Sequence, residues 1–201
     1  SIRHCEIYGN SGYSGSGAIT SSNSVSTFDN CLIHDNLINS GGIFNFPNGS
    51  GQSNIYSCTI AGNHMIQTFA RPLGGNSGSK FDLYNSIIWG NDNAQDFIGP
   101  DTDLTNCLVE GFILGVNDTL YTPVLDIDPQ FVAPNTADPD YSLLPSSIAV
   151  NVGSNANSFL TYDLQYNLRV QNGLVDLGAF EQNTCSQLND VCLGAVTLQV
   201  D

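Results

Sequence analysis

Two basic side chains on either side of a glycine-rich loop are the strongest candidates for catalysis in this sequence. Arg71 and Lys80 flank residues 72–79, which contain Gly74-Gly75. A β-elimination that cleaves an acidic glycan needs a Lys or Arg base beside carboxylates that bind calcium or neutralise the uronate. The pair is therefore compatible with a polysaccharide lyase, although a surface loop without chemistry explains the same residues.

Closely spaced aspartates are the second candidate for chemistry. A glycoside hydrolase needs two carboxylates about 5 to 10 Å apart. Asp101 with Asp103, or Asp126 with Asp128, could project together from a turn. We interpret Asp126 and Asp128 as turn and capping groups, because they lie in a Pro-containing phrase that follows the regular repeats.

Calcium is the only cofactor that the sequence suggests. Carboxylate oxygens are preferred calcium ligands, but neither a complete EF-hand loop nor a repeated Gly-Gly-x-Gly-x-Asp nonapeptide is present. The three histidines fall at different positions of the repeat described below, so a three-histidine metal site is not expected. The candidate calcium ligands are Asp92, Asp96, Asp101 and Asp103.

Aromatic residues recur at equivalent positions and could form a binding face. Two tyrosines each lie two residues before a Cys or Ser of the repeat, and Tyr8, His34 and Trp89 lie three residues after it. Aligned rings can stack against sugars or against a protein partner. They can equally pack under a loop or stabilise a sheet face. The candidate binding residues are Tyr56, Tyr84, Trp89, Arg71 and Lys80.

The six cysteines fall into two groups. Cys185 and Cys192 lie in a polar tail, where a disulfide is expected in an exported protein. Two thiols alone do not complete a zinc site. The other four share one position of the repeat, and we expect a reduced, buried stack, because parallel side chains lack the torsion that a disulfide needs. This stack consists of Cys5, Cys31, Cys58 and Cys107.

The element that must position all these residues is a repeated phrase. Its Cys or Ser falls at residues 5, 31, 58, 86 and 107, at intervals of 26, 27, 28 and 21 residues. Such a period indicates a solenoid with one supersecondary unit per repeat. The copies are His4–Asn10, Asn30–Asn36, Ser57–Asn63, Asn85–Asn91 and Asn106–Phe112.

Apolar alternation within the phrase predicts short strands. The Cys or Ser and the branched residue two places later point inward, and the residues beside them point to a mixed outer face. An apolar residue three places before the Cys or Ser forms a second inward column, which implies a bend between the two columns. An Asn five places after it, in the first four copies, predicts a ladder of amides on a left-handed turn. With Gly-rich corners and no sustained helical periodicity, the sequence predicts an all-β, right-handed parallel β-helix.

The composition is strongly acidic. Four basic and nineteen acidic residues give a net charge of −15, which repels phosphate backbones and anionic membrane surfaces, so nucleic-acid binding is not expected. No run approaches the roughly 18 to 20 apolar residues of a transmembrane helix, and no membrane insertion is expected. Excess carboxylates are typical of a solvated surface in a salty extracellular medium, or of loops that bind calcium.

The repeats are expected to occupy residues 1–113, a terminal repeat and cap residues 114–181, and a tail residues 182–201. An open β-helix exposes unpaired strand edges, so residues 126–181 are expected to finish and close the stack. The phrase is already present at Ile2, so an open first repeat is expected there. The tail could begin another domain or pair with an edge of another copy, and end-to-end contacts of this kind generate filaments.

Several separated segments agree in order with a known type of domain. Where that family usually has Asp-x-x-Gly-x-x-Arg, this chain has Tyr166-Asn167 between Asp163 and Arg169, and we expect Asn to replace Gly in the left-handed position. The segments are Asn85–Asn91, Asp126–Val132, Asp140–Gly153, Asp163–Val170 and Val175–Glu181. Over about residues 80–181 the chain resembles the end of choice-of-anchor Q domains, whose repeats are related to those of polymorphic outer-membrane proteins. The resemblance implies a bacterial surface protein, secreted and often multidomain, without a fixed activity.

Two functions are compatible with this sequence. The first is a non-catalytic extracellular module for adhesion, display or assembly, with other copies, neighbouring domains or glycans as partners. The alternative is a polysaccharide-active enzyme or a carbohydrate-binding remnant that uses the loop between Arg71 and Lys80. Short acceptor patterns for glycosylation occur at Asn48, Asn117 and Thr119, each of low specificity.

Overall fold

The chain folds almost entirely into β-strands, most of which pair in parallel. The computed structural model describes residues 1–12, 17–21, 23–46, 51–67, 71–75, 78–92, 101–111, 119–120 and 123–183. This part contains two six-stranded and two three-stranded parallel sheets, one antiparallel strand pair and one short 3₁₀ turn, η1 (Asn155–Asn157). Within it, no helix has the length and apolar character needed to cross a membrane.

The four parallel sheets each take strands from successive repeats. The first sheet contains, in order, β1 (Ile2–Arg3), β5 (Val25–Asp29), β9 (Gln52–Tyr56), β13 (Lys80–Tyr84), β15 (Thr102–Thr105) and β17 (Thr119–Leu120). The second sheet contains β2 (Glu6–Tyr8), β6 (Leu32–His34), β10 (Thr59–Ala61), β14 (Ile87–Trp89), β16 (Cys107–Val109) and β18 (Val124–Leu125). The third sheet contains β3 (Ser11–Gly12), β7 (Leu37–Ile38) and β11 (His64–Met65), and the fourth contains β4 (Ile19–Thr20), β8 (Gly42–Phe46) and β12 (Arg71–Gly75).

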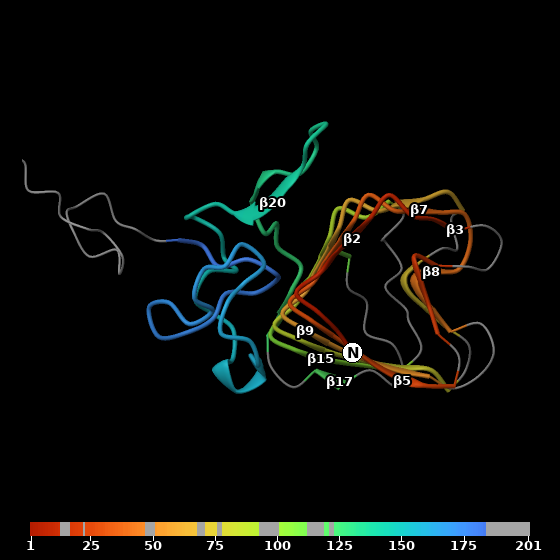
Figure 1. Cartoon of the computed structure of the whole chain (residues 1–201), viewed down its shortest axis with the longest axis horizontal. Helices are drawn as coiled ribbons and strands as arrows, with labels where there is room; N and C mark the ends of the chain where they lie inside the picture. Colours follow the sequence, from red (N-terminus) through yellow and green to blue (C-terminus); the bar gives the residue numbers. More distant parts are fainter. Residues whose placement is uncertain are drawn as a thin grey trace, which may run out of the picture.

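Each strand lies beside the equivalent strand of the next repeat. In the second sheet, Ile60 lies between Ile33 and Ile88, and in the first sheet Leu83 lies beside Ile55. The chain returns to the first sheet once per repeat, so like residues stack in columns. Figure 1 shows the strands of successive repeats superimposed around a common centre. This arrangement of parallel sheets is compatible with the predicted β-helix.

A left-handed residue makes the bend between the first and second sheets. It stands directly before the Cys or Ser in every copy of the phrase, where φ lies between 48° and 53°. Asn is the commonest residue there because it tolerates this conformation better than other side chains. The bend predicted between the two inward columns is therefore confirmed. The residues that make it are His4, Asn30, Ser57, Asn85 and Asn106.

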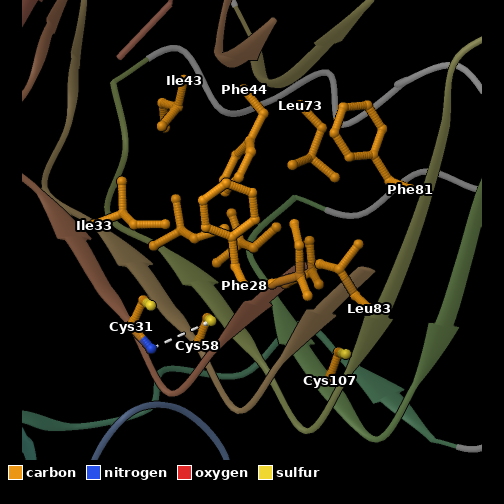
Figure 2. Packing of buried hydrophobic residues seen from close by; sticks show 14 of the residues in the cluster. Phe28, Cys31, Ile33, Ile43, Phe44, Cys58, Leu73, Phe81, Leu83 and Cys107 are labelled. Atoms are coloured by element: carbon orange, nitrogen blue, oxygen red, sulfur yellow. Dashed lines mark hydrogen bonds between the residues drawn. The ribbon is translucent and has the colours of Figure 1, made fainter. Parts of the chain in front are cut away.

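The interior is filled by the predicted inward columns (Figure 2). The rings of Phe28 and Phe44 meet edge to face with centroids 4.9 Å apart, which joins the first sheet to the fourth. Ile2, the first member of its column, is 39% exposed. The buried columns are Phe28, Ile55, Leu83 and Leu104 from the first sheet, and Ile33, Ile60, Ile88 and Val109 from the second.

The Cys or Ser of the phrase satisfies backbone groups at the bend. The Cys58 thiol donates to the carbonyl of Tyr56 at 3.2 Å and accepts the N–H of Cys31 at 3.4 Å; Figure 2 shows the second bond. The Ser86 hydroxyl repeats the pattern, because it donates to the Tyr84 carbonyl at 2.9 Å and accepts the N–H of Cys58 at 3.2 Å. A small side chain that both donates and accepts is therefore what this position requires.

The predicted asparagine ladder forms at the next turn. The amide of Asn36 donates to Asn63 Oδ1 at 2.8 Å, Asn63 donates to Asn91 at 2.8 Å, and Asn10 donates to Asn36 at 2.9 Å. The asparagines themselves are not left-handed, because the residue before each one takes the positive φ and frees the amide to reach along the stack. Those left-handed residues are Gly9, Asp35, Gly62 and Gly90.

The C-terminal segment, residues 126–183, packs against the outer side of the second sheet. Its Ala179 carbonyl accepts the amide of Asn30 at 2.8 Å, its Ala179 N–H donates to Thr59 Oγ1 at 3.0 Å, and its Gly178 N–H donates to the Asn85 carbonyl at 2.8 Å. These contacts reach three successive repeats. Figure 1 shows the segment, coloured teal to blue, outside the sheet that contains β2. The segment therefore lies along the side of the stack, whereas the sequence predicted a cap at its end.

Apolar side chains on the outer face of the second sheet explain why the segment binds there. This face was expected to be mixed, yet Leu32, Ile87 and Leu108 lie on it and are buried. The segment covers them with a second hydrophobic cluster, to which the hairpin of β19 (Phe131–Ala133) and β20 (Asp140–Leu143) contributes. The covering side chains are Phe131, Tyr141, Leu143, Ala149, Leu177, Ala179 and Phe180.

A buried arginine organises the C-terminal segment. Arg169 is 1% exposed, lies 3.3 Å from Glu181 Oε1 and donates to the Gly178 carbonyl at 3.1 Å. Asp163, which is also buried, accepts the backbone N–H groups of Asn167 at 2.7 Å and of Glu181 at 2.7 Å. Burial raises the pKa of Glu181 to about 8, even though the charge of Arg169 acts in the opposite direction. The charged side chains of residues 141–183 are thus turned inward, whereas Asp126, Asp128 and Asp138 nearer the start of the segment are exposed.

The turn between Asp163 and Arg169 differs from the expectation. Tyr166, not Asn167, occupies the left-handed position, with φ 65°. The backbone and side-chain N–H groups of Asn167 are instead bound to the Asp163 carboxylate at 2.7 and 3.0 Å. Asn167 therefore shapes the turn through its hydrogen bonds, and the strain falls on a bulky aromatic residue.

Candidate functional site

The outer face of the first sheet collects three of the five binding candidates, Lys80, Tyr56 and Tyr84, together with the calcium candidate Asp103. Lys80, Asp82 and Tyr84 alternate along β13 with buried apolar residues, because successive strand residues point to opposite sides. The parallel register places Asp103 of β15 beside Asp82, and Tyr56 of β9 beside Tyr84. Neighbouring strands thus assemble one polar group and one aromatic pair.

Lys80 is held by two carboxylates. Its Nζ lies 2.7 Å from Asp103 Oδ2 and 3.0 Å from Asp82 Oδ1, and Gln52 Nε2 donates to Asp82 Oδ2 at 2.6 Å. The hydrogen bonds with Asp103 and Asp82 raise the pKa of Lys80 above its ordinary value. A general base works best when its pKa lies near the operating pH. The geometry therefore opposes the predicted role of Lys80 as a base.

Asp82 belongs to this group, although it was not among the sequence candidates. It lies four residues before Ser86 of the repeat, just as Asp103 lies four residues before Cys107. Equal offsets in neighbouring repeats place side chains next to each other on one sheet face. The alignment of the repeats therefore predicts this carboxylate pair, although its two members are not close to each other in the sequence.

Two of the binding candidates lie apart from this group. Arg71 is the first residue of β12, in the fourth sheet, whereas Lys80 begins β13 in the first sheet. The length of β12 thus separates the two basic residues that flank the loop. Trp89 ends β14 in the second sheet and packs against the hydrophobic cluster under the C-terminal segment.

The aromatic pair is packed as a stack. The rings of Tyr56 and Tyr84 lie 4.9 Å apart at an interplanar angle of 9°, and Phe159 of the C-terminal segment meets Tyr56 edge-on at 4.9 Å. A sugar needs an open ring face on which to stack. One face of each tyrosine already covers the other, and Phe159 adds a further ring contact to Tyr56. This geometry favours packing over a platform for sugars.

A buried histidine on the second sheet is a further polar group that the sequence candidates did not include. His34 lies between the rings of Tyr8 and Tyr141, at centroid distances of 5.2 and 5.3 Å. Its Nδ1 is 2.6 Å from Asp35 Oδ2, and its Nε2 is 2.8 Å from Glu6 Oε1. Because a carboxylate occupies each ring nitrogen, neither nitrogen is available to a substrate.

The predicted calcium ligands that the structure describes have separate roles. Asp92 Oδ2 lies 2.7 Å from His64 Nδ1, Asp103 binds Lys80, and Asp101 is exposed, while Asp96 lies outside the described residues. In the described ranges, no group of three or more His, Cys, Asp or Glu side chains could hold a metal ion. Calcium binding stays a prediction.

The four stacked cysteines are free thiols. Three of them are buried as predicted, whereas Cys5 in the first repeat is only partly buried. Burial raises the pKa of Cys58 and raises that of Cys107 to about 12, so both remain protonated at neutral pH. A thiol reacts as its thiolate, so these two are unreactive in the fold.

The remaining predicted positions, except Thr119, lie outside the described residues. Cys185, Cys192, Asn48 and Asn117 lie outside the described residues, so the disulfide and the N-glycosylation sites stay predictions. Thr119 is exposed at the start of β17. No protein-family model, curated protein or solved structure matches this chain.

Proposed function

We propose that this chain is a right-handed parallel β-helix that serves as a non-catalytic structural and adhesive module of a secreted bacterial surface protein. The observation that carries the proposal is the environment of Lys80, whose ammonium is bound by Asp82 and Asp103. These side chains hold neighbouring strands together. The resemblance to choice-of-anchor Q domains supports the location at the cell surface.

The C-terminal segment supports a mechanical role. Its hydrogen bonds to Asn30, Thr59 and Asn85 join three repeats that would otherwise contact only their neighbours. Opening one repeat of the stack therefore also requires breaking contacts with the segment. A strapped stack of this kind suits a rigid spacer or display module.

The alternative function, a polysaccharide-active enzyme, is favoured by one observation. Asp82 and Asp103 lie side by side with Lys80 on a sheet face that is open to solvent around Lys80, whose side chain is 41% exposed. Acidic residues beside a lysine are the groups that a lyase would use. The ion pairs argue against this function, because they hold the lysine in its protonated form.

Incubation with polygalacturonate and with alginate, followed by ultraviolet absorbance of unsaturated products, separates the two functions. We expect no product from the 201-residue chain. Product formation that is lost in Lys80→Ala and retained in the control Arg3→Ala would overturn the structural proposal. Antibody labelling of intact cells that produce the protein tests the location, and labelling only after permeabilisation would contradict a surface module.

A further inference from the structure

Residues 141–183 of the C-terminal segment expose no charged side chain. Residues 141–183 contain four charged residues, and all are buried: Asp163 at 0% exposure, Arg169 and Asp176 at 1%, and Glu181 at 3%. The chain as a whole carries a net charge of −15. A stretch of this length that turns every charge inward therefore contrasts with the rest of the molecule.

The same stretch exposes many large apolar side chains. Single exposed apolar residues are normal, but a surface that is rich in aromatic and aliphatic groups and depleted of charge is typical of a protein interface. The most exposed of these residues is Tyr166, at 76%. The exposed set is Leu144, Ile148, Val152, Phe159, Tyr162, Tyr166, Leu168, Val170 and Leu174.

Four of these residues share one hairpin, residues 161–170. Tyr162 and Leu168 are antiparallel partners, and side chains opposite each other in such a pair lie on the same side. Val170, two residues after Leu168, is also exposed, at 49%. The alternate residues Asp163 and Arg169 turn inward and are buried. The hairpin thus has a charged inner side and an apolar outer side.

Tyr166 stands at the tip of this hairpin under backbone strain. Its φ of 65° is costly for a bulky side chain, and strain that persists in a fold is often associated with function. Its ring contacts His4 at a centroid distance of 5.0 Å but remains mostly exposed, so burial does not offset the strain. A glycine would fit the turn without strain. Because burial does not offset this strain, we expect the exposed ring to contact another molecule.

We propose that the outer side of this hairpin, formed by Tyr162, Tyr166, Leu168 and Val170, is an interface on which a second copy of the chain docks side to side. Two copies with the same strong negative charge repel each other, and a face without exposed charge lets them meet at the lowest electrostatic cost. The same face on both copies gives a closed two-fold dimer, whereas end-to-end contacts give an open series. This inference rests on the proposed structural role and names its partner.

Sedimentation equilibrium of the 201-residue chain at physiological salt tests the interface. We expect a monomer–dimer equilibrium without larger species. Leu168→Glu should weaken the dimer at least about tenfold, because it places an unpaired charge in an apolar contact. Val25→Glu is the matched control, since Val25 is 69% exposed on the first sheet and gains the same charge, and it should leave the dimer unchanged.

Tyr166→Gly separates binding from folding. It should raise the melting temperature by relieving the left-handed strain, and it should also weaken the dimer. A purely structural role for the ring predicts a lower melting temperature instead. A chain that stays monomeric at every concentration, a dimer unaffected by Leu168→Glu, or an open series of oligomers would each overturn the side-to-side interface. None of these results bears on the glycan assay, which tests the structural role by itself.

Discussion

The stacked repeats and the C-terminal segment are stabilised in opposite ways. In the repeats the same contact recurs one repeat further along the stack, as in the asparagine ladder from Asn10 to Asn91. In the segment each buried group is used once, and Arg169 serves several neighbours by itself. Periodic contacts therefore spread stability along the stack, whereas the segment depends on a few irreplaceable residues.

The two regions also differ in how they treat charge. The repeats keep their ion pairs near solvent, as with Lys80, whereas the segment buries Arg169 together with its carboxylates. Burying charges is expensive, and the expense is offset only when every partner is present. Substitutions in the segment should therefore have larger effects than equivalent substitutions in the repeats.

The largest effect is expected from removing the buried arginine. Arg169→Met should lower the free energy of unfolding by about 3 to 5 kcal/mol, because the carbonyls of Gly178 and Asp176 lose their donor and the buried Asp176 carboxylate loses a compensating charge. Lys80→Met, which removes an ion-paired cation from the repeats, should cost about 1 kcal/mol or less. Urea unfolding followed by fluorescence of Trp89, the only tryptophan, reports the contact with the segment. Equal losses in the two variants would contradict the comparison.

The segment should also respond to pH. Glu181 has a pKa of about 8 in the fold against 4.5 ordinarily, because of burial. Between these values the folded carboxyl retains a proton that the unfolded chain has released, so the free energy of unfolding should fall as pH rises from 4.5 to about 8 and then level off. Glu181→Gln should flatten this dependence. An equally steep decline in that variant would show that other groups cause it.

In the repeats, position within the ladder should set the effect of losing an asparagine. Asn63 is fully buried and bonds to both neighbouring asparagines. Asn63→Ala should cost about 3 kcal/mol, because the backbone N–H of Asn36 loses its acceptor and the carbonyls of Ile33 and Ala61 lose a donor. Asn10→Ala at the exposed end should cost about 1 kcal/mol or less. Chemical denaturation of both variants measures the gradient. Similar costs at the two positions would mean that burial within the ladder does not determine how much each asparagine contributes to stability.

The smallest effect concerns the thiol column. Cys58→Ser should change the free energy of unfolding by less than about 1 kcal/mol, because Ser86 already makes the same two hydrogen bonds one repeat further on. Cys58→Ala should cost about 1 to 2 kcal/mol more than Cys58→Ser, since the N–H of Cys31 loses its acceptor. Thermal unfolding of the two variants measures the difference. If both behave alike, the position needs only a small side chain.

The outer surface was the hardest part to predict from the sequence. The Tyr56–Tyr84 pair follows from equal offsets in neighbouring repeats, but its contact with Phe159 joins residues that no period relates. Leu32, Ile87 and Leu108 were apolar on a face expected to be mixed, and this was the available sign that something covers it. What covers it is a segment that bonds to Asn30 from 149 residues away.

Spacing along the sequence predicts the inward columns, the bend before each Cys or Ser, and the asparagine ladder. These features repeat along the chain, so one-dimensional spacing already states which residues become neighbours. Only the folded chain shows that Phe159 packs against Tyr56, that Tyr166 takes the strained position, and that the C-terminal segment lies along the side of the stack. Each of these depends on contacts between faces and on buried charges that occur once, and a contact used once leaves no period in the sequence.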